Sequence, residues 1–90
     1  MKAKIKRLKI RSGIEIKLGA NDRVLSAHAC GFDIIVFYLS HITPGELALF
    51  EILVVDTGEV INSNAIYIAS VLLDSGFDEK HILLRKKYSG

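Results

Sequence analysis

The sequence predicts an all-β protein of about seven antiparallel strands that form a small sandwich or barrel. Short apolar runs recur along the chain, and turn signals separate them roughly every 8–12 residues, as such folds require. Several runs are β-branched at consecutive positions, which favours strands over helices. Because 90 residues provide material for only one core, we expect residues 1–90 to form a single β domain.

The first two strands are predicted from alternation of apolar and charged residues. Residues 14–18 alternate with period two, the pattern of a strand with one wet face. Residues 2–11 alternate as well, but the parity of the apolar residues changes between Ile5 and Leu8. The inward face therefore switches in this segment, and we expect a β-bulge near Lys6-Arg7.

The remaining strands follow from apolar runs bounded by turn residues. Gly31-Phe32 should join residues 23–30 and 33–41 in a hairpin, whose second strand is apolar on both parities and needs cover on both faces. Later strands are predicted over residues 47–55, 65–73 and 81–88, with turns at 42–45, 56–58, 62–64 and 74–78. This apolar strand surface is more than one small core uses, so we expect a homo-oligomer, either a symmetric dimer or a larger assembly.

Charge is distributed unevenly along the chain. All twelve lysines and arginines lie at or before Arg23 or at or after Lys80, whereas residues 24–78 contain seven acidic residues. Since the first and last strands of small barrels are often neighbours, we expect Arg7 and Arg85 to lie close together in a positive strip that binds phosphate or an acidic patch. The alternative is a solvated edge strand whose lysines prevent aggregation.

Composition excludes several classes of protein. No apolar run is long enough to span a bilayer, and the basic start of the chain does not read as a signal peptide, so we expect a cytoplasmic protein that does not bind membranes. The single cysteine, Cys30, excludes an internal disulfide and a cysteine-cluster metal site. We interpret it as a small buried residue in a strand.

No sequence motif indicates an enzyme. The chain lacks the phosphate-loop, dinucleotide, zinc-protease and serine-hydrolase motifs, and no metal or cofactor is predicted. His28, His41 and His81 are far apart in the sequence and are interpreted as unrelated. Asp56-Thr57-Gly58 also occurs in aspartic proteases, but a turn is the preferred interpretation, with Asp56 bonding local backbone and Gly58 supplying a positive φ.

The second half of the chain carries a recognisable pattern. It consists of Leu49-Phe50-Glu51-Ile52, a Thr57-Gly58 loop, the run Ala65 to Val71 with Tyr67-Ile68, and a glycine turn at Gly76-Phe77. The chain resembles a family of small phage and prophage β proteins of unknown function, and the resemblance extends loosely over most of the chain. The resemblance implies a phage accessory protein in the host cytoplasm, and such proteins often counter host defence by sequestering a nucleotide signal or blocking a defence effector.

We therefore expect a non-enzymatic protein that binds a small anionic ligand or a host protein. The candidate ligand-binding residues come from two sources. The basic strands contribute Arg7 and Arg85, and the resemblance implies Thr57, Asn62, Asn64 and Tyr67. Each of the carried-over residues is equally compatible with turn chemistry or packing. The alternative function is a nucleic-acid-binding module that uses the basic terminal strands, although the tyrosines do not form an evident stacking cluster.

Overall fold

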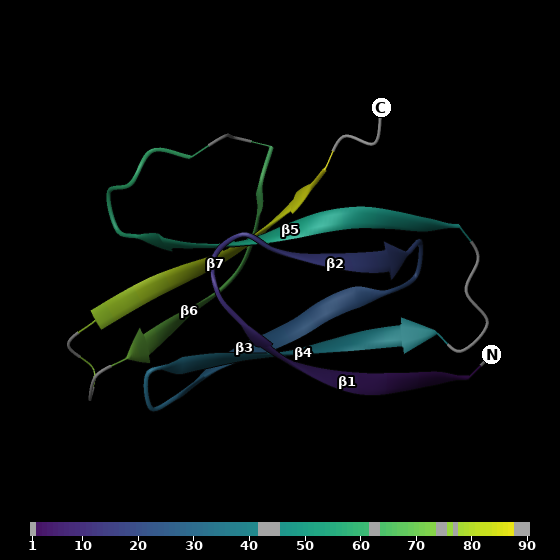
Figure 1. The fold of residues 1–90 in the computed structure, drawn as a ribbon, viewed down its shortest axis with the longest axis horizontal. Helices are drawn as coiled ribbons and strands as arrows, with labels where there is room; N and C mark the ends of the chain where they lie inside the picture. Colours follow the sequence, from purple (N-terminus) through teal and green to yellow (C-terminus); the bar gives the residue numbers. More distant parts are fainter. Residues whose placement is uncertain (1, 42–45, 62–63, 74–75, 77, 88–90) are drawn as a thin grey trace.

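The computed structural model describes residues 2–41, 46–61, 64–73, 76 and 78–87, and these residues confirm the all-β prediction (Figure 1). A three-stranded antiparallel sheet has the order β1 (Ala3–Ile10), β4 (Asp33–His41), β3 (Arg23–Cys30). A four-stranded antiparallel sheet has the order β2 (Ile14–Gly19), β5 (Leu47–Asp56), β7 (Asp78–Lys86), β6 (Ile66–Leu73). The described residues include no helix long and apolar enough to cross a membrane.

The two sheets share one apolar core, as expected of a small sandwich. Its most buried large side chains are Val36 of the three-stranded sheet and Ile52 and Ile82 of the four-stranded sheet. Strands β3 and β6 also pack against each other across the two sheets. No polar or charged residue within the described part of the chain is fully buried, so burial of apolar side chains accounts for this core.

The predicted hairpin is present. Cys30 pairs with Asp33 across Gly31-Phe32, and Gly31 adopts a φ of 65°, which glycine tolerates better than other residues. Ile34, Ile35 and Val36 are all buried, as expected for a strand that lies between β1 and β3. Cys30 itself is exposed, which corrects the prediction of a buried cysteine, because it lies at the open end of β3 beside the turn.

The bulge predicted near Lys6-Arg7 is absent. Strand β1 pairs with β4 without interruption, from Ala3 opposite His41 to Ile10 opposite Ile34. Side chains alternate along an unbroken strand, so Lys4 and Lys6 lie on the same face of β1 as Leu8 and Ile10, while Ile5 lies on the opposite face and is 65% exposed. The prediction was wrong because it assumed that the inward face is apolar along its whole length. Register shifts occur instead between Val24 and Ser26 and between Tyr67 and Ala69.

The first and last strands are not neighbours, contrary to the prediction. Strand β1 is an edge of the three-stranded sheet, whereas β7 lies inside the four-stranded sheet between β5 and β6. The chain passes from one sheet to the other immediately after β1, so the consecutive strands β1 and β2 belong to different sheets. A single closed barrel, on which the prediction was based, would have placed the two ends side by side.

Core burial makes a direct prediction about stability. Ile82→Ala removes a side chain that is 1% exposed, and we expect it to lower the free energy of unfolding by about 2–5 kcal/mol. The matched control is Ile5→Ala, whose side chain is largely exposed and whose loss should cost about 0.5 kcal/mol or less. Urea unfolding of the three proteins measures both changes. Equal losses for the two variants would contradict the register of β1 and the position of the core.

Candidate functional site

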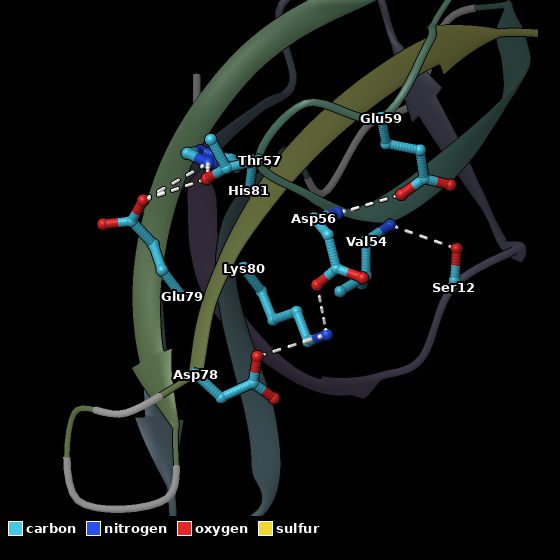
Figure 2. A network of polar contacts seen from close by, with 9 residues as sticks. All are labelled: Ser12, Val54, Asp56, Thr57, Glu59, Asp78, Glu79, Lys80 and His81. Atoms are coloured by element: carbon cyan, nitrogen blue, oxygen red, sulfur yellow. Dashed lines mark hydrogen bonds and ion pairs between the residues drawn. The ribbon is translucent and has the colours of Figure 1, made fainter.

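Two basic residues of β7, Lys80 and Arg85, are paired with acidic residues of the same four-stranded sheet. Arg85 binds Glu51 of β5, directly opposite it in the sheet. Lys80 binds the carboxylates of Asp56 and Asp78, as Figure 2 shows, and the hydrogen bond to Asp56 raises the pKa of the Lys80 ammonium. These cations are therefore already neutralised within the four-stranded sheet.

The same holds just after β7, where Lys87 Nζ lies 2.8 Å from Glu15 Oε2 of β2 and the hydrogen bond raises the pKa of Lys87. The predicted positive strip is thus divided. Arg7 is exposed on the edge strand β1 of one sheet, while Arg85 lies on an interior strand of the other sheet and is occupied by Glu51. The topology does not bring the two arginines together on adjacent strands.

Two other predicted residues, Thr57 and Tyr67, do meet, through His81. Thr57 Oγ1 lies 2.7 Å from His81 Nε2, and the Tyr67 hydroxyl lies 3.0 Å from His81 Nδ1. Thr57 Oγ1 also donates a hydrogen bond to Glu79 Oε1 at 3.2 Å. The same Glu79 oxygen lies 3.5 Å from His81 Nε2 (Figure 2). His81 was not predicted in this role, because only the pairing of β6 with β7 brings it close to Tyr67. The polar atoms of this network bind one another.

The Asp56 turn is confirmed in part. Gly58 has a φ of 88°, and the Glu59 N–H donates to the Asp56 carbonyl at 3.1 Å, as a turn requires. The Asp56 carboxylate, however, binds Lys80 and not the local backbone. Asn64 is exposed between β5 and β6, and Asn62 lies outside the described residues.

A pocket of about 360 Å³ lies at the other end of the molecule, where β1 begins and β4 ends. In Figure 1 this is the right-hand end, at which the N-terminus, the ends of β2 and β4 and the start of β5 gather. Its lining residues come from both sheets and the β2–β3 connection: Lys4, Lys6, Lys17, Asp22, Tyr38, Ser40, His41 and Leu47. Its volume is typical of sites for small molecules.

The pocket is strongly basic. Lys4 and Lys6 reach it because the unbroken register keeps them on the inward face of β1, beyond the apolar residues that pack in the core. Lys17 lines the pocket from β2, an edge strand of the four-stranded sheet. None of these lysines forms an ion pair with a residue in the described part of the chain. Three like charges around one hollow create a positive potential that attracts anions.

Asp22 supplies the only carboxylate among the described lining residues, and its hydrogen-bonding capacity is largely used. Asp22 Oδ2 accepts a hydrogen bond from the Gly19 N–H at 2.8 Å. Asp22 Oδ1 accepts a hydrogen bond from the His41 N–H at 2.9 Å and also lies 2.8 Å from His41 Nδ1. The backbone bond from Gly19 and then the bonds from His41 lower the pKa of Asp22. Because the carboxylate only accepts, His41 Nδ1 must donate, which leaves Nε2 for a ligand.

None of the five predicted ligand-binding residues that the structure describes lines this pocket. No family model matches the chain, and no curated protein and no solved structure matches it. The resemblance to small phage proteins therefore stays a prediction. The candidate site rests on the geometry of Lys4, Lys6, Lys17 and the Asp22–His41 pair.

The Asp22–His41 pair predicts a pH-dependent contribution to stability. Since the pKa of Asp22 is lowered in the folded protein, its contribution is present above the unfolded value near 3.8 and is lost as the pH falls through the folded value. We expect Asp22→Asn to cost about 1–3 kcal/mol at pH 7, because an amide nitrogen cannot accept the Gly19 N–H. The gap between the two proteins should narrow as the pH falls below about 4.

The control is Asp33→Asn, which removes an exposed carboxylate 3.8 Å from Lys9 and should change stability by less than about 1 kcal/mol. Denaturant unfolding at several pH values measures both variants. A constant gap between wild type and Asp22→Asn from pH 7 to pH 3 would show that the hydrogen bonds to ionised Asp22 do not stabilise the fold.

Proposed function

We propose that this protein binds a small, multiply charged anion, such as a phosphate-bearing molecule, in the lysine pocket, and that it does so without catalysing a reaction. The observation that carries the proposal is the set of three lysines around one hollow whose only described carboxylate is already held by Gly19 and His41. An anion that enters the pocket would relieve the mutual repulsion of the ammoniums. Lysine is a common phosphate binder because its ammonium acts as a compact charge.

The other lining groups suit an oxyanion as well. Tyr38 and Ser40, which lie opposite Lys6 and Lys4 on β4, carry hydroxyls that can donate hydrogen bonds. His41 Nε2 adds a further cationic donor when the ring is protonated. Together these groups provide several hydrogen-bond donors from one short stretch of paired strands, which favours an anion with several oxygen atoms.

The proposed activity agrees with the one implied by the phage-protein resemblance. A phage accessory protein that sequesters a nucleotide signal in the host cytoplasm needs affinity for phosphate groups and does not need to break a bond. Blocking a defence effector is the other form of the same proposal, in which the basic pocket contacts an acidic surface of a host protein. Both forms assign the binding energy to the lysine pocket.

Calorimetric titration with inorganic diphosphate tests the pocket. We expect wild type to bind one diphosphate and Lys4→Gln/Lys6→Gln to lose at least about tenfold in affinity, since each charge-assisted hydrogen bond is worth about 1.5–3 kcal/mol. The control, Arg7→Gln/Lys9→Gln, removes the same net charge from the opposite face of the same strand and should bind almost as well as wild type. Equal losses in the two variants, or no binding by wild type, would overturn the proposal.

A nucleic-acid-binding function is the second candidate, because the basic residues of β1 lie on both faces of an edge strand. These basic residues would contact the phosphate backbone of a nucleic acid through their total charge, and no single pocket would be needed. In that case a short oligonucleotide would bind more tightly than diphosphate, its affinity would fall steeply with salt, and Arg7→Gln/Lys9→Gln would lose as much affinity as Lys4→Gln/Lys6→Gln. Titration of these three proteins with both ligands therefore separates the two functions.

A second copy of the chain is the proposed partner of the outer face of the four-stranded sheet. This face is the side away from the shared core, and β6 places Tyr67 and Leu72 on it. Tyr67 and Leu72 are each 56% exposed, although the outer face of a sheet in a monomer is usually polar. A two-fold contact would cover the same apolar side chains on both copies.

Light scattering at micromolar concentration tests this assembly. We expect a mass of at least two chains for wild type and about one chain for Leu72→Asp, because a carboxylate in the contact would have to be buried without a partner. Ile5→Asp is the control, since Ile5 is similarly exposed but lies on the other sheet. A monomer of 10.0 kDa for wild type would refute the proposed self-association.

A further inference from the structure

A second hollow adjoins the lysine pocket. It has a volume of about 450 Å³ and shares Asp22 and Leu47 with the lining of the first. The rest of its lining comes from the ends of β2, β5 and β7 and from the residues next to them: Leu18, Gly19, Ala20, Glu46, Ala48, Phe50 and Lys86. Because Asp22 and Leu47 line both hollows, the two hollows are neighbours.

The second hollow differs in chemistry from the first. Leu18, Ala48 and Phe50 give it an apolar wall, and Leu18 is held in the core at 3% exposure. Such a wall suits a flat ring, which can stack on the aromatic and aliphatic side chains. The lysine pocket, in contrast, is lined mainly by charged and hydroxyl-bearing residues. Lys86 also lines the second hollow, so its apolar wall lies beside a cation. A ligand with phosphate groups at one end and a ring at the other fits the two hollows.

Glu46 narrows the class of ligand. Its side chain is exposed, lines the second hollow and forms no ion pair with the described residues. An ionised carboxylate only accepts hydrogen bonds, so it complements a ring with N–H donors and is a poor neighbour for an acyl chain. Nucleobases are rings with N–H donors, and nucleotides join them to phosphate groups.

We infer that the ligand is a nucleotide, with its phosphates on Lys4, Lys6 and Lys17 and its base in the hollow beside Phe50 and Glu46. This inference rests on the proposed anion-binding function and adds the class of ligand. Asp22 lies between the two parts, where its carboxylate is occupied by Gly19 and His41. The shared residue Leu47 provides an apolar surface along which the sugar can lie.

Calorimetric titration with inorganic diphosphate, with nucleoside diphosphates of the four bases and with the free nucleosides tests the inference. We expect at least one nucleoside diphosphate to bind wild type about tenfold more tightly than diphosphate, because stacking of the base adds to the phosphate contacts. Ala48→Trp fills the second hollow and should reduce nucleotide affinity to the level of diphosphate while diphosphate affinity stays constant. Ala3→Trp, which adds the same bulk at an exposed position of β1, is the control.

Glu46→Gln provides a second variant in case the tryptophan disturbs β5. It should reduce the ratio of affinities between the best and the worst of the four nucleoside diphosphates by about fivefold or more. Nucleotides that bind no more tightly than diphosphate, or an Ala48→Trp variant that loses diphosphate affinity equally, would overturn this inference and leave the anion site in place. If wild type binds neither diphosphate nor any nucleotide, the proposed function itself fails.

Discussion

The candidate site depends on the unbroken pairing of β1 with β4. Leu8 and Ile10 are fixed in the core or against it, and alternation along the strand then dictates that Lys4 and Lys6 lie on the same face. A shift by one residue would turn every side chain of β1 over and place the lysines outside and Ile5 inside. The packing of Leu8 and Ile10 opposes such a shift, so the core at one end of β1 positions two charges at the other end.

The distribution of carboxylates decides which cations remain for a ligand. On the four-stranded sheet, acidic residues lie opposite or beside Lys80, Arg85 and Lys87 and neutralise them. On β1 and β2 the pocket lysines lack such partners among the described residues, and the nearby Asp22 is held by hydrogen bonds from Gly19 and His41. A protein with a formal charge of only +2 can thus present a concentrated positive site at one end.

Much of the fold could be predicted from the sequence, because it depends on local patterns. Alternation identified β2, and Gly31-Phe32 between two apolar runs identified the β3–β4 hairpin. The division into two sheets could not be predicted, since it depends on which strands pair at long range. The pairing of β7 with β5 and β6, which separates Arg85 from Arg7, has no signal in either strand alone.

The candidate site was missed for a related reason. Apolar residues were expected to mark the inward face, so the lysines at even positions of β1 indicated a bulge. The available signal was that Lys4 and Lys6 continue the spacing of Leu8 and Ile10, which becomes interpretable only when the partner strand is known. Thr57 and Tyr67 were expected to share a ligand site, whereas in the structure each forms a hydrogen bond with His81.

The proposed anion site joins the inward lysines of β1 to the end of β4. An NMR titration with inorganic diphosphate, followed through assigned backbone amides, tests it most directly. The structure predicts saturable shifts that are largest around Lys4, Lys6, Lys17, Ser40 and His41, with little change around Thr57, Tyr67 and His81 at the opposite end. Shifts spread evenly over all basic segments, or confined to the region of His81, would contradict it.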